Sequence, residues 1–176
     1  ATGKRDQQTP RADVLMNLWP EHVLLCAADW SVRSAVVGLD GVALLPTLLP
    51  EDAQKILKQW LSAYVAAWQS PLPVTVKAGL AYVSEQAKSQ ATDDAQNDAQ
   101  QEAQSEGKNE AKNEAALDKA SKAFSDSFSE DNDYSRSLYV QRSFESFEDI
   151  REGLPQWAPL LYASLVASAT MEVASA

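Results

Sequence analysis

Residues 68–86 read WQSPLPVTVKAGLAYVSEQ, and this stretch decides how the middle of the chain is divided. Pro71 and Pro73 follow each other closely, and proline ends a helix because it lacks a backbone N–H and its ring clashes with the preceding turn. We therefore predict one helix that ends near Ser70 and a second that begins at about Lys77. Lys77 is the one charged residue in an apolar run, which leaves three interpretations open: catalysis, DNA contact, or a surface lysine on a packed segment.

The helix before these prolines is the clearest amphipathic element in the sequence. Pro50, Glu51 and Asp52 are typical of a helix start, because acidic side chains are stabilised at the positive end of the helix dipole. Apolar residues then recur every three or four positions, as on one face of a helix: Ile56, Leu57, Trp60, Leu61, Tyr64, Val65 and Trp68. We expect this face, with its aromatic residues Trp60, Tyr64 and Trp68, to lie in the core.

Upstream of this helix, the pattern predicts another helix and a β-hairpin. Apolar residues recur at helical spacing over residues 11–28, where Pro20 is expected to kink or divide the helix. Two β-prone runs follow at residues 32–37 and 42–45. The Asp-Gly pair at residues 40–41 suits the tight turn between them, because it tolerates the positive φ angles of such turns.

The composition changes abruptly downstream. Residues 87–122 contain no valine, isoleucine or aromatic residue, and alanine recurs every fourth position from Ala87 to Ala103. Two interpretations stay open: an alanine-repeat helix that docks a partner, and a low-complexity insertion, helical or disordered, that cannot bury enough apolar surface to pack. Alanine burial is weak, which favours the insertion. We expect order to return near Leu117.

The last part of the chain is less clearly patterned. SEDNDYSR, at residues 129–136, resembles a loop, and residues 138–144 fit either a strand or a short helix. Apolar spacing then predicts a helix over residues 147–157 and another after Pro159.

Length and charge limit the class of protein. The chain has 176 residues, 45% of them hydrophobic, so we expect residues 1–176 to form a single domain with a core. Because it begins with Ala1, we expect a fragment or a processed chain. A net charge of −10 disfavours autonomous binding to a phosphate backbone. One cysteine forms no internal disulfide, which fits a reducing compartment, and no apolar segment is long enough to cross a bilayer.

Few residues suit catalysis. His22 is the single histidine and Cys26 lies one turn beyond it, so a Cys/His dyad is open, but a structural histidine and a buried thiol are favoured. One cysteine and one histidine make no zinc site, and the glycines form no phosphate-binding loop. Glu-x-Lys triplets, which serve metal-dependent nucleases on strands, occur at 106–108 and 110–112 inside the low-complexity segment. We therefore predict no catalytic, cofactor-binding or metal-binding residue.

The order of these elements resembles a known family. A helix carries LWPEHVLLCAADW, a hairpin and the helix PEDAQKILKQWLSAYVAAWQSPLP follow, and an acidic segment precedes YSRSLYVQRSF. The most specific matches are Trp68-x-x-PLP followed by Lys77, and the segment Tyr139 to Phe144. Residues 11–165 thereby resemble the C-terminal domain of the exonuclease V gamma subunit, RecC. The low-complexity run departs from the family pattern.

The resemblance implies a helix-rich α/β (α+β) domain related to the PD-(D/E)XK nucleases, degenerate because the catalytic residues are lost. It would contain the β-hairpin and the helical or disordered insertion at residues 87–122. The implied role is a scaffold and DNA-channel domain of the cytoplasmic RecBCD helicase-nuclease, exodeoxyribonuclease V, in double-strand-break repair and homologous recombination. The implied partners are the RecB-like and RecD-like subunits, with DNA reached through the assembled complex. The chain would be a C-terminal fragment of a larger subunit, and this domain by itself would not be an enzyme.

Three basic residues are the candidate contacts with DNA or a partner: Lys77, Arg136 and Arg142. Lys77 is expected to have no carboxylate partner that would make it catalytic, and a structural role is favoured over DNA contact. Trp30 or Trp157, if exposed, would be a candidate partner contact, because tryptophan anchors interfaces. Two other functions stay open: a free-standing adaptor that uses the alanine-repeat helix, and an active nuclease with a divergent site.

Overall fold

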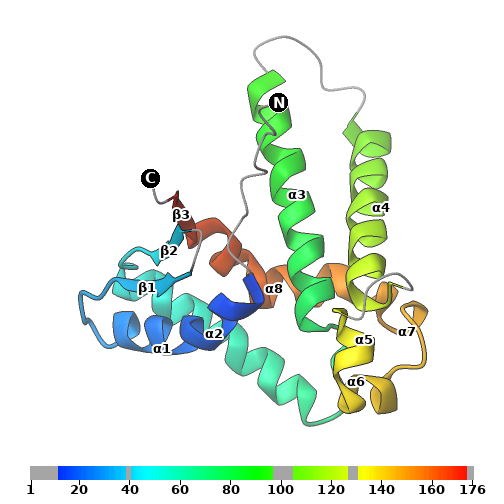
Figure 1. The fold of residues 1–176 in the computed structure, drawn as a ribbon, viewed down its shortest axis with the longest axis horizontal. Coiled ribbons are helices and arrows are strands. Elements are labelled where there is room, and N and C mark those ends of the chain that lie inside the picture. Colours follow the sequence, from blue (N-terminus) through cyan, green and yellow to red (C-terminus); the bar gives the residue numbers. More distant parts are fainter. Residues whose placement is uncertain (1–11, 39–40, 97–104, 127–130, 174–176) are drawn as a thin grey trace. The chain divides into compact units, whose positions relative to one another are not determined.

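A computed structural model describes residues 12–38, 41–96, 105–126 and 131–173 (Figure 1). The chain divides into two compact units, residues 1–61 with 165–176, and residues 62–164. Each unit is described by itself below. The single domain expected over residues 1–176 stays a prediction, because two compact units of one chain can still fold together.

The first unit begins with helix α1 (Ala12–Ala27), which continues through Pro20. The proline therefore does not divide the helix. One face of α1 is fully buried and supplies much of the core of this unit, with Leu15, Trp19, His22, Val23 and Cys26. The apolar spacing over residues 11–28 had predicted this helix, and the structure confirms it.

A small antiparallel sheet completes the first unit. Strand β1 (Ser34–Val37) pairs with β2 (Gly41–Leu45), with Ser34 opposite Leu45, which confirms the predicted hairpin. The turn expected at residues 40–41 lies partly outside the described residues, which omit 39–40. A third strand, β3 (Thr170–Val173), pairs with the other edge of β2, so the strand order is β1-β2-β3. The sequence pattern did not predict β3.

Helix α2 (Pro50–Ala67) starts at the predicted proline and has Glu51 and Asp52 in its first turn. Its buried face was predicted only in part, since Ile56 is buried as expected. The buried residues are Ala53, Ile56 and Ala63, whereas Leu61, Tyr64, Val65 and Trp68 are exposed. The buried face therefore carries two alanines where larger apolar residues had been expected.

The second unit is built around two long helices that lie side by side (Figure 1). Helix α3 (Val76–Gln96) begins just after the two prolines, as predicted, and α4 (Ser105–Phe124) packs against it. Residues 87–122 were expected to form a helical or disordered insertion that does not pack; residues 87–96 and 105–122 are helical, and the last turns of α4 do pack. Ala116, Leu117 and Ala120 are buried on one side of α4, near the point where order was expected to return.

Four further helices follow: α5 (Asp133–Arg136), α6 (Leu138–Ser143), α7 (Glu148–Arg151) and α8 (Leu154–Ser168). They belong to the second unit, except for residues 165–168 of α8, which belong to the first. Residues 133–136 are therefore helical, not part of a loop, and residues 138–143 adopt the helical alternative. Pro159 lies inside α8 and does not begin a separate helix. Phe147, Ile150 and Leu154 are buried, as their spacing had predicted.

The described residues thus form a helix-rich α+β structure with one small antiparallel sheet. Among the described helices, none combines the length and the apolar character that a membrane span requires.

Candidate functional site

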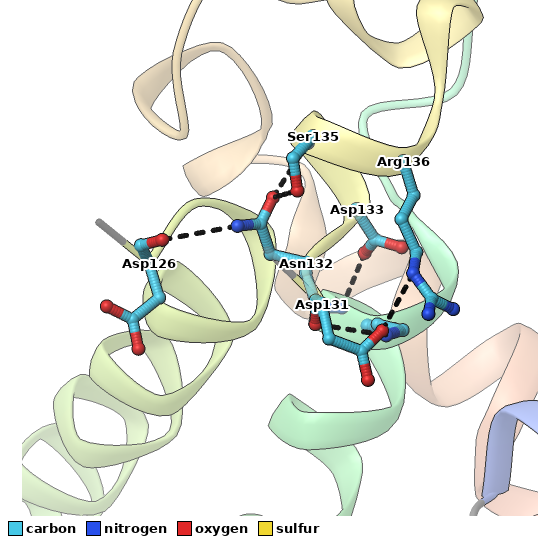
Figure 2. A network of polar contacts seen from close by, with 8 residues as sticks. Asp126, Asp131, Asn132, Asp133, Ser135 and Arg136 are labelled. Carbon is cyan, nitrogen blue, oxygen red and sulfur yellow. Dashed lines mark hydrogen bonds and ion pairs between the residues drawn. The ribbon is translucent and has the colours of Figure 1, made fainter. Parts of the chain in front are cut away.

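The start of α3 carries an ion-paired cluster in which one carboxylate serves two basic side chains (Figure 2). The Nζ of Lys77 donates to the side-chain carboxylate of Asp131 and, at 3.0 Å, to its backbone carbonyl. The Nε of Arg136 lies 2.9 Å from Asp131 Oδ1. The Lys77 side chain is 19% exposed, whereas those of Asp131 and Arg136 are 47% and 56% exposed, so only the lysine is withdrawn from water.

Asn132 fixes the backbone that presents these groups. It is the N-cap of α5, where its Oδ1 accepts from the Ser135 N–H at 2.7 Å and from the Ser135 hydroxyl at 2.8 Å. Its Nδ2 donates to the carbonyl of Asp126 at 3.2 Å, as Figure 2 shows. Asn132 is buried, and its amide bonds to the chain on both sides. The cap therefore holds Asp131 and Arg136 on either side of a short, well-defined turn.

Asp133 joins α5 to α3. Its Oδ2 accepts a hydrogen bond of 2.9 Å from the backbone N–H of Ala78, one of the N–H groups that the first turn of α3 leaves without a helical partner. Thr75, the residue before α3, has a buried hydroxyl with no hydrogen-bond partner among the described residues. The capping role that the threonine normally fills is thus taken by Asp133.

An open groove of about 320 Å³ lies beside this cap. Its walls come from the start of α3, from α5 and α6, and from α8. Most of the lining is apolar, with Val74, Val76, Tyr139, Val140 and Phe144. The polar groups of the lining belong to Thr75, Asp133, Ser137, Ser143 and Tyr162.

Tyr162 lies against α3 because residue 79 is glycine. A Cβ atom at Gly79 would lie within 2.7 Å of Tyr162 Cδ2, closer than carbon atoms approach. The side chain is 6% exposed. Burial, and secondarily the negative charge of Asp133, raise the pKa of Tyr162 well above that of a free tyrosine, so the hydroxyl keeps its proton.

The structure brings together two of the three predicted site residues. Lys77 and Arg136 meet at Asp131, whereas Arg142 is exposed on α6. The expectation that Lys77 lacks a carboxylate partner was wrong, because Asp131 lies far along the sequence in a segment that resembled a loop. Asp131, Asn132 and Asp133 were missed as site residues; the Asn-x-x-Ser spacing of a helix cap was the signal that could have found them.

His22 has a structural role in the first unit. Its Nε2 lies 3.0 Å from the Pro46 carbonyl, which can only accept, so Nε2 carries the proton. Nδ1 then accepts from the Ser34 hydroxyl at 2.9 Å. Cys26 Sγ lies 3.7 Å from the same Nε2, which is therefore not free to take the thiol proton. This geometry supports the predicted structural histidine and buried thiol over a Cys/His dyad.

The Glu-x-Lys triplets at residues 106–108 and 110–112 lie in helix α4, not on a strand. Residues two apart on a helix do not share a face, so neither triplet forms the arrangement that a nuclease strand provides. In the part of the chain that the structure describes, no three His, Cys, Asp or Glu residues are grouped as metal ligands.

Trp30 was to be a candidate partner contact if exposed, and its side chain, just after α1, is 64% exposed. Trp157 on α8 is only partly exposed.

Comparison with known proteins gives one family. Residues 4–87 match the model of the RecC C-terminal domain, and the matched residues include α1, the β1-β2 hairpin, α2 and the first part of α3. No curated protein matches the chain. The match ends where the composition changes, so α4 to α8 and most of the groove lie beyond it.

Proposed function

We propose that the chain is a non-catalytic scaffold domain of a RecC-type gamma subunit, because residues 4–87 match the model of the RecC C-terminal domain. In this proposal it acts inside the cytoplasmic exodeoxyribonuclease V complex, in double-strand-break repair and recombination. The family match is the observation that supports the proposal, and it bears out the resemblance as far as residue 87.

The proposed role is exercised through protein contacts with RecB-like and RecD-like subunits. Lys77 and Arg136 already share the carboxylate of Asp131, so their charges are partly neutralised within the chain. A net charge of −10 also opposes tight binding of free DNA by the domain alone. DNA is therefore reached through the assembled complex, whose channel this domain helps to form.

Two exposed residues are the proposed outward contacts. Trp30 offers a large apolar surface of the kind that anchors interfaces. Arg142 is exposed on α6, and it is the candidate basic residue best placed to meet a phosphate or an acidic partner. The degenerate nuclease-like fold implied by the resemblance is part of the same proposal.

Capture of partner subunits tests this proposal. The tagged chain is mixed with RecB-like and RecD-like subunits of the same source, with and without a DNA-end competitor and over a range of salt concentrations. We expect capture of at least one subunit that resists both salt and competitor. Absence of capture by a chain shown to be folded by circular dichroism would contradict the proposal.

Three variants separate protein contact from DNA contact. Trp30→Ala should weaken capture by about tenfold or more if the tryptophan is an interface anchor. Lys77→Gln should leave capture unchanged, because Lys77 is engaged by Asp131. Arg142→Gln should lower the salt sensitivity of DNA binding by the assembled complex, by a slope of about one, if Arg142 meets a phosphate.

A further inference from the structure

The groove of the second unit contains polar groups whose hydrogen-bonding capacity is only partly used. Asp133 Oδ2 accepts a hydrogen bond from the Ala78 N–H, whereas Asp133 Oδ1 accepts none from any described residue. The Tyr162 side chain is buried, and in the described part of the chain its hydroxyl makes no hydrogen bond. Asp133 is half-buried and, like Tyr162, lines the groove, so its unused Oδ1 and the Tyr162 hydroxyl offer two acceptors to a donor that enters there.

Asp133 is the one charged residue among those that line the groove. Lys77 and Arg136 both pair with Asp131, and Asp133 makes no ion pair within the described residues. Arg142 is exposed on α6, where water and salt screen its charge. The Asp133 carboxylate in a mostly apolar lining favours a cation over a phosphate as the ligand of the groove itself.

The walls favour one kind of cation. Tyr139 and Phe144 supply aromatic surface, and Val76 and Val140 supply aliphatic surface. A guanidinium is planar, weakly hydrated and stacks on aromatic rings, and its several N–H groups can reach two acceptors at once. A lysine ammonium is more strongly hydrated and gains less from such walls. Tyr139 is 81% exposed at the rim and offers further contact area.

We propose that this groove is a docking site for an arginine side chain of a partner protein. The guanidinium donates to Asp133 and to the Tyr162 hydroxyl, while its aliphatic stem lies along the apolar walls. The neighbouring residues of the partner segment lie over Leu138 and Tyr139. The inference stands on groove residues that lie mostly beyond residues 4–87, and it does not depend on the proposed assembly with RecB-like or RecD-like subunits.

A small-molecule titration of the full chain tests the site. The probe is N-acetyl-L-arginine N-methylamide, followed through backbone amide shifts, with the citrulline analogue as its neutral isostere. We expect saturable shifts for residues 74–78 and 137–144 with the arginine probe, and binding of the citrulline probe about tenfold weaker or undetectable. Equal binding of the two probes would overturn the proposal, and so would unsaturated shifts scattered over the acidic surface.

Matched variants locate the charge. Asp133→Asn keeps an oxygen for the Ala78 N–H but removes the negative charge, and it should weaken the arginine probe by about tenfold. Asp118→Asn removes a surface charge on α4, where Asp118 pairs with Lys122, and should leave the affinity unchanged. Equal weakening by both variants would mean general attraction to an acidic chain and would refute the site. Tyr162→Phe removes only the hydroxyl and should also weaken binding of the arginine probe. This variant serves as the test if Asp133→Asn does not fold.

Discussion

Replacement of Asp133 by alanine tests how the N-terminus of α3 is held. Thr75 is the N-cap of α3, because its carbonyl accepts the first helical hydrogen bond, from Gly79 N at 2.9 Å. A threonine at this position usually accepts the N–H three residues on through its hydroxyl. That N–H belongs to Ala78 and is bonded to Asp133, while Thr75 Oγ1 is buried without a partner. We expect the Thr75 hydroxyl to take over the Ala78 N–H in Asp133→Ala.

Replacement of Asp133 by Thr75 as the acceptor of the Ala78 N–H determines the expected changes in the free energy of unfolding. Loss of an N-cap typically costs about 1 kcal/mol, so recovery by Thr75 should limit the cost of Asp133→Ala to about 0.5 kcal/mol. Thr75→Val removes an unpaired buried hydroxyl and should be neutral, or stabilising by up to about 1 kcal/mol. In the Thr75→Val background no cap is left to recover, so Asp133→Ala should then cost about 1 to 2 kcal/mol.

The assay is urea unfolding of the four proteins, followed by circular dichroism at 222 nm. The decisive quantity is the coupling between the two positions, expected to be about 1 kcal/mol. A cost of Asp133→Ala that is equal in both backgrounds to within about 0.3 kcal/mol would refute the exchange. It would mean that Asp133 holds α3 through something other than the Ala78 N–H.

Further substitutions test the packing of Gly79, His22 and Tyr162. Gly79→Ala should lower the free energy of unfolding, because overpacking against Tyr162 costs about 1 to 3 kcal/mol and outweighs the gain in helix propensity of about 1 kcal/mol; Tyr162→Leu should relieve this cost in a double mutant. His22→Ala should cost about 2 to 4 kcal/mol in urea unfolding, because it leaves a cavity and removes bonds to Ser34 and Pro46. Burial, and secondarily Asp133, raise the pKa of Tyr162 in the folded protein. The stability that the protonated Tyr162 hydroxyl contributes is therefore complete below the unfolded-state pKa of about 10 and is lost as the pH rises above that value. Tyr162→Phe should therefore lose stability less steeply than the parent above about pH 10, and equal slopes would contradict this.

The local signals of the sequence were sufficient for most helices and for the hairpin. Pro71 and Pro73 separate α2 from α3 because proline acts within one turn of its own position. The Asp-Gly pair between two β-prone runs predicted the pairing of β1 with β2 for the same local reason.

Burial was harder to predict because it depends on distant parts of the chain. Tyr64 and Trp68 fit an apolar stripe, yet the face of α2 that is covered is the one with Ala53 and Ala63. Strand β3 is short and forms only because the free edge of β2 is available to it. Neither preference is visible within a window of a few residues.

The basic residues of the candidate site were predicted from the sequence, but the acidic residues were not. Lys77 and Arg136 were chosen as isolated basic residues, but their relation depends on Asp131, 54 positions after Lys77. Residues 129–136 were interpreted as a loop, so α5 was not predicted. Its N-cap, Asn132, places Asp131 and Asp133 beside the start of α3. Ion pairs of this kind follow from tertiary folding, which no spacing rule within one segment describes.

The role as a scaffold domain is tested most directly by the molar mass of its complexes. The chain, 19.2 kDa by itself, is mixed with the RecB-like and RecD-like subunits of its source and passed through size exclusion with light scattering, at low and high salt. We expect a one-to-one complex with at least one subunit, with an unchanged mass at high salt. A folded chain that elutes alone in both conditions, and that joins only complexes containing DNA, would contradict a role exercised through protein contacts.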